Sequence, residues 1–569
     1  MGAQMSMRGR MFLMRVALGV DFGTESARAL LVDLDSREEC GSAEASYRHG
    51  VIDEVLPSSS ARLPHEWALQ DADDYLDALE RSVRDVFDGS AASPEDVVSL
   101  GIDTTACTVV PCTSDLVPLS RLASFRENPY AYAKLWKDHS SQYCADDLNG
   151  LLRDTPGYLE YYGGSLSPEW MLPKTLMIYR EAPSVFESTE LFLEQEDWIV
   201  SNLVGKVVRG AHVAGYKGGY REESIGYPPA KLLDKASSGF SAVLNKLGHD
   251  FKSPGQLAGL LVEKWADRLK LPRELPVAVG NMDAHVAVLG AGVVEPNVIV
   301  AVMGTSVCDL LVSDKLAAVK GIQGVVRNGI LPKMWAYEAG QAGVGDTYAW
   351  FVKKLMRNSE CDPQRTVGEI FRSLEEEAED IPAAQTGIIA LDWLNGNRSR
   401  LIDTQLSGVI VGLTVSTQPA EIYRALLEST ALGQRVIFDA FQEYGIEIKR
   451  IVACGGLAKK SPLLMQILAD VTGREIEATS SSNTPALGAA LHGAIAGAAV
   501  ESWEEAADVA KRQVTTYRPI ESNQKAYDSL YQVYMQLHDF FGVEKPEIMH
   551  SLRATRSVSG NNHMNWREK

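Results

Sequence analysis

Two segments far apart in the sequence repeat one pattern that suits phosphate binding. An apolar run ends in Asp-Phe-Gly-Thr at 21–24, and a second apolar run follows at 29–33. An apolar run at 298–303 likewise leads into Gly-Thr-Ser at 304–306, with another at 309–312. The glycine lets backbone N–H groups approach an oxyanion, and the hydroxyl residue adds a donor. Two such turns facing each other would hold a polyphosphate from both sides, which indicates ATP.

Only the first copy carries a carboxylate, Asp21, directly before its turn. Mg²⁺ that accompanies nucleotide phosphates is usually held by one or two carboxylates together with water and the phosphates. The sequence therefore predicts that Asp21 positions Mg²⁺, directly or through water.

A second carboxylate, Asp283, is placed where it could do chemistry. It follows an apolar stretch at 277–279 and a Gly-Asn turn, which would expose its side chain at a strand end. Phosphoryl transfer to a hydroxyl needs a carboxylate that orients the hydroxyl and accepts its proton. The alternative is that Asp283 caps a helix over 284–289, since aspartate is a preferred N-cap residue.

These residues must be positioned by alternating strands and helices. Apolar and helical spacing predicts strands at 16–20, 29–33, 43–47, 97–103, 298–303, 309–312 and 450–454, and helices at 65–87, 419–444, 462–472 and 484–499. The last helix consists of small residues, which would let it lie close to its neighbour. The order predicts a mixed sheet with helices on its faces, built twice, with a boundary near 292–297.

Composition indicates a soluble enzyme. The 569 residues carry a formal net charge of −20, which argues against nucleic acid or an anionic membrane as a partner. The seven scattered cysteines favour a reducing compartment, so the expected location is cytoplasmic. No His or Cys cluster indicates zinc, and no apolar run is long enough to cross a membrane.

Further motifs carry a resemblance to a known family. Besides the two turns and the segment around Asp283, they are Asp-Thr-Thr-Ala-Cys-Thr at 103–108, the segments 129–137 and 214–217, Tyr-Glu-Ala-Gly-Gln at 337–341, and the segments 391–398 and 454–457. In this order and spacing, from about 16 to about 500, the chain resembles the FGGY family of carbohydrate kinases.

The resemblance implies an α/β fold of two ribonuclease H-like (actin-like ATPase) domains that flank a central cleft. The N-terminal domain would span 12–293 and hold the sugar site and the catalytic base. The C-terminal domain would span 294–545 and hold the nucleotide site. The polar, turn-rich residues 546–569 are expected to form a mobile tail. ATP and Mg²⁺ are the implied cofactors.

The resemblance also assigns the sugar site. Asp283 is implied as the base, with Lys217 and Glu338 in the sugar pocket and Ala106 lining it through its backbone. Without the resemblance, Lys217 would be interpreted as a solvated surface lysine. Trp136 could stack on the sugar or belong to the core.

The implied ATP-binding residues are Thr24, Arg28, Gly304, Thr305, Ser306, Gly340, Gly455 and Gly456. Arg28 could instead be a surface residue of its hairpin, and Gly340 could instead serve tight packing. Two residues depart from related kinases. Glu25 replaces a hydroxyl residue that contacts phosphate in glycerol kinases, and Ser461 replaces an asparagine near adenine, which leaves base selectivity open.

Within the family, the motifs are most similar to those of kinases that phosphorylate ribulose. The implied reaction transfers phosphate to the 5-hydroxyl of ribulose, by preference L-ribulose, in L-arabinose catabolism. The implied partner is a small ketopentose, and a homodimer is compatible with the resemblance. The alternatives are a family member that acts on D-ribulose, xylulose or glycerol, and a sugar sensor without catalysis. A sensor would be expected to lack Asp21 or Asp283.

Overall fold

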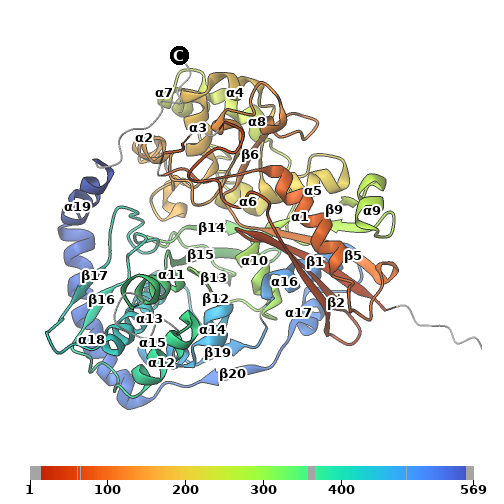
Figure 1. The fold of residues 1–569 in the computed structure, drawn as a ribbon. Coiled ribbons are helices and arrows are strands. Elements are labelled where there is room, and N and C mark those ends of the chain that lie inside the picture. Colours follow the sequence, from red (N-terminus) through yellow and green to blue (C-terminus); the bar gives the residue numbers. More distant parts are fainter. Residues whose placement is uncertain (1–13, 60–61, 65, 357–364, 482, 559–569) are drawn as a thin grey trace, which may run out of the picture.

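The computed structural model describes residues 14–59, 62–64, 66–356, 365–481 and 483–558. Two seven-stranded sheets form the centres of two halves of the molecule, and helices cover their faces (Figure 1). A third region of short helices and a small sheet extends beyond the first sheet. No helix among these residues is long and apolar enough to cross a membrane.

The first sheet has the strand order β3-β2-β1-β5-β10-β9, with β11 also paired to β5. Its strands are β1 (Val16–Phe22), β2 (Ser26–Asp33), β3 (Glu39–Ser46), β5 (Val97–Thr104), β9 (Leu257–Leu260), β10 (Pro276–Ala278) and β11 (Asn281–Met282). The three leading strands are antiparallel, whereas β1, β5 and β10 run parallel. Antiparallel β9 closes one edge.

The second sheet repeats this plan with the order β14-β15-β13-β12-β18-β19-β20. Its strands are β12 (Val298–Met303), β13 (Val307–Ser313), β14 (Gly324–Arg327), β15 (Trp335–Gln341), β18 (Arg450–Cys454), β19 (Ile476–Thr479) and β20 (Val514–Tyr517). Antiparallel β12, β13 and β15 lead, parallel β18 and β19 follow, and antiparallel β20 ends the sheet. The duplicated mixed sheet predicted from the sequence is confirmed.

Two helices join the halves. Helix α10 (Asp283–Gly290) follows the first sheet in the chain, yet its Val288 packs with Val300 of the second sheet. Helix α16 (Thr484–Ala496) comes late in the chain, yet its Ala486 packs with Ala17 of the first sheet. Each half therefore covers the facing sheet of the other, and the two helices also pack against each other.

Small residues allow this close approach, as expected for the 484–499 helix. A Cβ atom at Gly19 of β1 would overlap the carbonyl oxygen of Ala486, and one at Gly101 of β5 would overlap that of Ala489. The first sheet and α16 are thus in backbone-to-backbone contact.

The remaining helices cover the outer faces of the sheets. They are α1 (Ala72–Asp85), α5 (Gln195–Val204) and α9 (Glu263–Leu269) in the first half, and α11 (Gly345–Trp350), α12 (Val367–Glu379), α13 (Pro419–Glu443), α14 (Gly456–Lys460), α15 (Pro462–Thr472) and α18 (Glu521–Asp539) in the second part of the chain. Helix α17 (Trp503–Ala510) instead packs beside α16 and α10, on the face of the first sheet that α16 covers. Two short strands, β16 (Ile389–Leu391) and β17 (Val409–Val411), pair beside α13.

The third region has its own hydrophobic core and was not anticipated from the sequence. Its sheet has the order β4-β7-β6-β8, from Leu69–Gln70, Ala133–Lys134, Val109–Cys112 and Leu191–Glu194. Its helices are α2 (Gln142–Leu152), α3 (Met171–Glu181), α4 (Pro183–Ser188), α6 (Ala211–Tyr216), α7 (Ala230–Ala236) and α8 (Leu244–Leu247). Elements this short give little periodicity to recognise.

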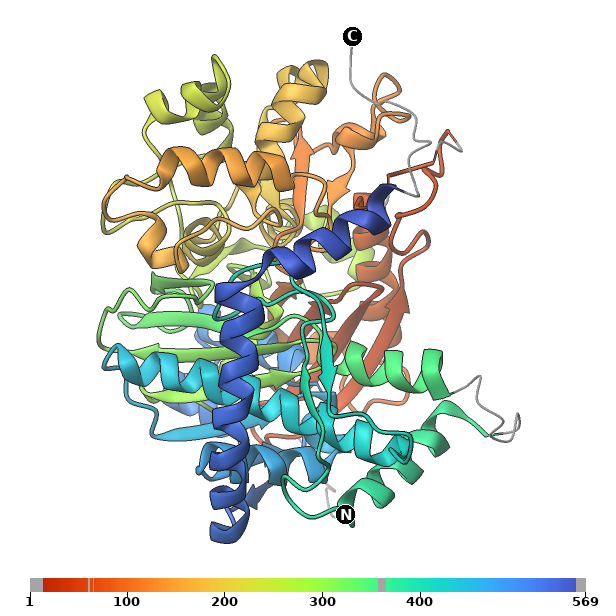
Figure 2. The same cartoon turned by 90° about the vertical axis from the view of Figure 1, so that its left-hand side faces the viewer.

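Two predicted segments differ from the structure. The helix expected over 65–87 begins only at Ala72, because Asp71 caps it by accepting a hydrogen bond from the Asp73 N–H. In the segment expected to be a mobile tail, Glu547–Val558 forms helix α19, which continues along one side of the molecule from α18 (Figure 2). Met549 on this helix is buried. Residues 559–569 lie outside the described part.

Candidate active site

Three polar residues form a row where parallel strands of the first sheet end. Asp21 on β1 is in register with Asp103 on β5, and Asp103 is in register with Asn281 on β11. The strand neighbours of Asp21 and Asp103 pack in the hydrophobic core on the outer face of the first sheet, away from the second half. Because successive side chains of a strand point to opposite faces, Asp21 and Asp103 point towards the second half. The row therefore faces the other sheet.

Asp103 was noted in the sequence only as the first residue of a motif. Its side chain is wholly buried, and its carboxyl group contacts that of Asp21. Burial, together with the charges of Asp21 and Asp283, raises the pKa of Asp103 well above its usual range. The available sequence signal was an apolar strand that ends in aspartate, as the Asp21 strand also does.

Asp283 lies beside this row, as the first residue of α10. Its Oδ1 accepts a hydrogen bond of 2.6 Å from the Ala284 N–H, whereas Met282 occupies the N-cap position. Burial raises the pKa of Asp283 to about 7, and the charges of Asp21 and Glu338 contribute. A carboxylate with a pKa near neutrality is suited to accepting a proton at physiological pH.

A buried charged cluster joins the two halves next to Asp283. The Nζ of Lys217, directly after α6, donates to both carboxylate oxygens of Glu338 on β15, at 2.7 and 2.8 Å. The Nε2 of His285 on α10 lies 3.2 Å from Glu338 Oε2. Lys217 has only 3% of its side chain exposed, so the surface-lysine alternative is wrong.

The charges in this cluster stabilise each other. Burial alone would raise the pKa of Glu338, but the Lys217 charge and the hydrogen bond from His285 hold it far below its usual range. Burial alone would lower the pKa of Lys217, but Glu338 raises it above its usual value. The cluster therefore presents a paired ammonium and carboxylate, which can together bind several sugar hydroxyls.

A buried lysine that the sequence gave no reason to select holds the loop containing Ala106. Lys174 lies in the middle of α3, and its Nζ donates to the carbonyl oxygens of Cys107, Leu135 and Lys134 at 2.7, 2.7 and 3.2 Å. Ala106 packs between two hydrophobic cores, those of the third region and of the domain interface. The backbone at Ala106 is thereby fixed between the two halves.

The first phosphate turn is held by the third region. The indole Nε1 of Trp136 donates to the Thr24 hydroxyl at 3.2 Å, and Gln70 Nε2 donates to the Thr24 carbonyl at 2.7 Å. Trp136 is partly buried at the edge of the third region's core. Trp136 could stack on the sugar or belong to the core, and its position favours the core. Its hydrogen bond also helps to position Thr24.

Arg28 is bonded within its hairpin. Its guanidinium donates to Glu44 on β3 at 3.0 Å, and the Ser26 hydroxyl donates to the same carboxylate at 2.6 Å. The side chain is about one-third exposed. This position matches the surface alternative, so Arg28 would have to exchange its partner to contact a phosphate.

The second turn has three residues like the first, but its glycine N–H bonds to the second residue after it instead of the third. The Gly23 N–H donates to the Ser26 carbonyl at 2.9 Å, and the Gly304 N–H donates to the Ser306 carbonyl at the same distance. Thr305 at its tip is exposed. Gly455, with a φ of 91°, approaches this strand so closely that a Cβ atom would lie 2.6 Å from the Met303 carbonyl oxygen.

The other nucleotide candidates lie around the second turn. Gly456 is exposed, with open space where a Cβ would be. The Gly340 N–H donates to the Ser399 hydroxyl at 3.2 Å, and a Cβ there would overlap the Val307 carbonyl oxygen, which favours packing as its role. The Ser461 hydroxyl donates to Glu375 at 2.6 Å.

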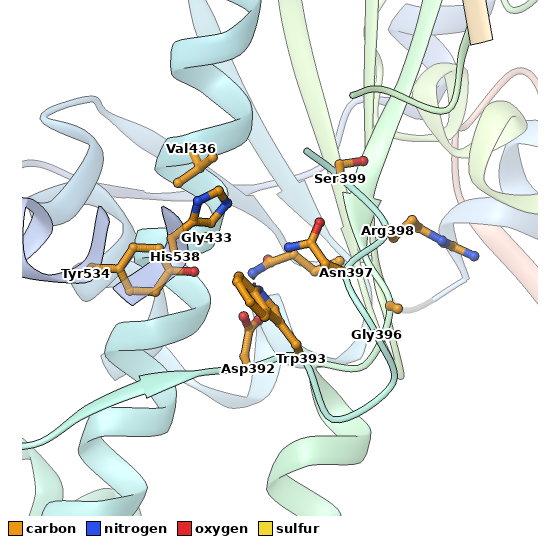
Figure 3. A pocket seen from close by; sticks show the side chains of 12 residues that line it. Asp392, Trp393, Gly396, Asn397, Arg398, Ser399, Gly433, Val436, Tyr534 and His538 are labelled. Atoms are coloured by element: carbon orange, nitrogen blue, oxygen red, sulfur yellow. Dashed lines mark hydrogen bonds between the residues drawn. The ribbon is translucent and has the colours of Figure 1, made fainter. Parts of the chain in front are cut away.

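A cavity in the second half is distinct from this cluster (Figure 3). It is lined by Gln341, Asp392, Trp393, Asn397, Tyr534 and His538, among others. Gln341 Nε2 donates to Asp392 Oδ2 at 2.8 Å, and Gln341 points to the opposite face of β15 from Glu338. Arg398 points away from this cavity, and its guanidinium lies 3.9 Å from Glu169 of the third region.

The residues around Asp21 fit a divalent cation. Within the described ranges no three His, Cys, Asp or Glu side chains gather into a metal site. Mg²⁺ does not need such a cage, because it retains waters and binds one or two carboxylates plus substrate phosphates. Asp21 and Asp103 offer carboxylate oxygens at the end of the row, and apart from the Asp21 carboxyl group the buried oxygens of Asp103 have no hydrogen-bonding partner in the described part of the chain.

Comparison with known proteins supports one family. Residues 299–497 match the model for the FGGY family of carbohydrate kinases, C-terminal domain. The chain is 43% identical over 554 residues to a protein of Halalkalibacterium halodurans named ribulokinase, covering 96% of this chain and 98% of that protein. It is 42% identical to a ribulokinase of Mycolicibacterium smegmatis, covering 95% and 97%.

Solved structures agree on the fold. A xylulose kinase from Rhodospirillum rubrum superimposes with a TM-score of 0.76 at 21% identity, covering 94% of this chain and all of that one. A Plasmodium falciparum glycerol kinase with ADP superimposes with a TM-score of 0.71 at 16% identity, covering 92% and 98%. The predicted pair of ribonuclease H-like domains is confirmed.

Proposed function

The chain belongs to the FGGY family of carbohydrate kinases and is an ATP-dependent sugar kinase, and we propose that its sugar substrate is ribulose. The reaction would place phosphate on the 5-hydroxyl of L-ribulose, as a step of L-arabinose breakdown. The observation that carries the proposal is the buried Lys217–Glu338 pair beside Asp283. The names of the full-length relatives point to the same substrate.

Asp283 is the proposed base. Its carboxylate orients the sugar 5-hydroxyl and takes its proton as the oxygen attacks the γ-phosphorus of ATP. The nearby negative charges of Asp21 and Glu338 raise its pKa and thus its affinity for that proton. After transfer, the proton resides on Asp283 and leaves to solvent when the products depart.

Lys217 and Glu338 are the proposed sugar-binding pair. The Lys217 ammonium can donate to a hydroxyl or to the ketose carbonyl oxygen, and the Glu338 carboxylate can accept from a neighbouring hydroxyl. Their mutual bonds of 2.7 and 2.8 Å keep both groups charged and in place before the sugar arrives. Ala106 would line the same pocket through its backbone.

The two turns are the proposed phosphate clamps. Thr24 and, after release from Glu44, Arg28 would contact the phosphates from the first half. Gly304, Thr305 and Ser306 would contact them from the second, with Gly455 and Gly456 beside the nucleoside and Gly340 behind the turn. Asp21 would hold Mg²⁺, which when bound neutralises charge on the phosphates during transfer. Closure of the two halves would exclude water from the γ-phosphate.

The test is ADP production by the purified protein with Mg·ATP on a panel of sugars. The panel contains L- and D-ribulose, L- and D-xylulose, glycerol and a control without sugar. We expect the largest kcat/KM with L-ribulose. A higher value for D-ribulose, xylulose or glycerol would assign one of those substrates instead, and no sugar-dependent ADP would favour a sensor.

Location and assembly follow as secondary proposals. We place the enzyme in the cytoplasm because ATP and free pentuloses meet there, and its six described cysteines are unpaired. A homodimer is the proposed assembly, and light scattering of the full chain would measure it.

A further inference from the structure

Asp103 has no part in the reaction as proposed, although it lies at the centre of the site. It ends β5 between Asp21 on one neighbouring strand and Asn281 on the other. Its side chain is wholly buried. Apart from the Asp21 carboxyl group, neither of its oxygens has a hydrogen-bonding partner in the described part of the chain.

This arrangement needs a positive partner. A buried carboxylate without donors is costly, and two adjacent carboxylates repel each other. They remain side by side only if a proton or a cation lies between them. Asn281 could have donated to Asp103, yet its amide nitrogen also has no partner among the described residues. The pair is thus left open to something that the chain itself does not provide.

The second half shows that the fold does not need this acidic pair. Val302 and Cys454 occupy the corresponding register positions on β12 and β18. Val302 lies two residues before the glycine of the second turn, as Asp21 does before that of the first, and Cys454 ends β18. Both second-half residues pack against hydrophobic neighbours of the interface core. The same backbone is therefore stable with apolar residues, and the acidic pair serves a ligand.

We propose that Asp103 is a second carboxylate for the divalent cation that accompanies ATP, so that Asp21 and Asp103 hold this cation together. Carboxylate oxygens are the ligands that such hard cations prefer, and two of them with phosphate and water suit Mg²⁺. The proposal rests on the proposed role of Asp21. Because no third side-chain ligand is at hand among the described residues, tight cation binding requires nucleotide phosphates.

The test measures cation binding without turnover. Mn²⁺ is titrated into the full-length protein with saturating ADP and no sugar, and free Mn²⁺ is followed by its electron paramagnetic resonance signal. The variants are Asp21→Asn, Asp103→Asn and Asp103→Ser. The matched control is Asp309→Asn, which changes a wholly buried carboxylate on β13 that is bonded to Gln434 at 2.9 Å.

We expect Asp103→Asn and Asp103→Ser to weaken Mn²⁺ binding about 10- to 100-fold, as loss of a metal-supporting residue typically does. Asp309→Asn should bind Mn²⁺ like the wild type. The thermal midpoint of Asp103→Asn without ligands should not fall, because the change removes a buried acid that has no donor. A residue kept only for folding would show the opposite, namely a lower midpoint with unchanged Mn²⁺ affinity.

The outcomes separate this inference from the proposed function. Weakened Mn²⁺ binding in Asp21→Asn but not in the Asp103 variants would overturn the role of Asp103 alone. Unchanged binding in all three variants would remove both carboxylates from the cation site. Neither result depends on which sugar is the substrate, because the titration contains none.

Discussion

The two Gly-Thr turns have one backbone plan but different surroundings. Each links two antiparallel strands through three residues. The glycine N–H donates at 2.9 Å to the Ser26 carbonyl at the start of β2 in the first turn, and to the Ser306 carbonyl in the second. Two residues before the glycine of the first turn stands Asp21, which pairs in register with Asp103 on the neighbouring parallel strand. The residues at the same two positions in the second half are Val302 and Cys454. Both halves thus have the turn, while only the first has acidic residues at these two positions.

The helices that follow the parallel strands differ in the same way. Helix α10, after the first sheet, begins with Asp283, whereas α16, after the second, begins with Thr484. The residues proposed for acid–base chemistry and for cation binding therefore all belong to the first half. The second half contributes Glu338 to the buried charged cluster and an exposed turn that is proposed to bind phosphate.

The largest expected effect tests the asymmetry at the helix starts. Asp283→Asn should lower kcat by about 10²- to 10⁴-fold, because the amide cannot accept the sugar proton. Sugar and nucleotide affinities, measured by calorimetry, should stay near wild type. The counterpart change Thr484→Ser should leave kcat unaltered. An Asp283→Asn enzyme with near-normal turnover would remove Asp283 as the base.

A pH profile sharpens the same assignment. Burial and neighbouring acids raise the pKa of Asp283 to about 7, and only the deprotonated form can accept a proton. Activity should therefore fall about tenfold per pH unit below this value and level off above it. The residual activity of Asp283→Asn should lack this acidic limb. A limb that persists in the variant would belong to another group.

The next effect concerns the charged pair that joins the halves. Lys217→Met leaves Glu338 buried without its cation, which typically costs about 3–5 kcal/mol of unfolding free energy. The double variant Lys217→Met with Glu338→Gln should recover much of that stability but not sugar binding. Urea unfolding and sugar titration measure the two quantities separately. Recovery of both would mean that the pair is structural and does not contact sugar.

Much of the fold could be predicted, because long strands and helices leave periodic patterns. Apolar runs predict the strand that contains Asp21 and the strand that leads into the turn of Thr305, and helical spacing predicts α13 and α15. The third region could not be predicted, because its strands of two to four residues are too short to show a periodic pattern of apolar residues. Register between β1 and β5, which places Asp103 beside Asp21, is a long-range property that no local pattern contains.

The proximity of candidate site residues could be predicted where a motif points to one residue. Lys217, Glu338 and Asp283 are brought together as the family resemblance implied. Lys174 was missed because a lysine inside a helix looks like a solvated residue. Its role depends on three carbonyl oxygens contributed by two distant loops.

A smaller effect tests how closely each sheet approaches its crossing helix. Gly101 of the first sheet contacts the α16 backbone, whereas Val452 at the corresponding place contacts α10 through its side chain. Gly101→Ala should lower the unfolding free energy by about 1–3 kcal/mol, because an overpacked site must shift. Gly456→Ala is the control, since nothing lies within 4 Å of its added Cβ. Equal thermal midpoints for the two variants would contradict the close approach.

The smallest expected effect compares the threonines of the two turns. Thr24 accepts a hydrogen bond from Trp136, whereas the exposed Thr305 has no side-chain hydrogen bond within the described residues. Thr24→Val should therefore cost about 0.5–1.5 kcal/mol of unfolding free energy, because it leaves the Trp136 N–H without its acceptor. Thr305→Val should leave the thermal midpoint unchanged and instead raise the KM for ATP several-fold. If Thr305→Val lost as much stability as Thr24→Val and left the KM for ATP unchanged, the second turn would be a structural copy without a phosphate. Every group proposed to take part in proton or phosphate transfer would then lie in the first half.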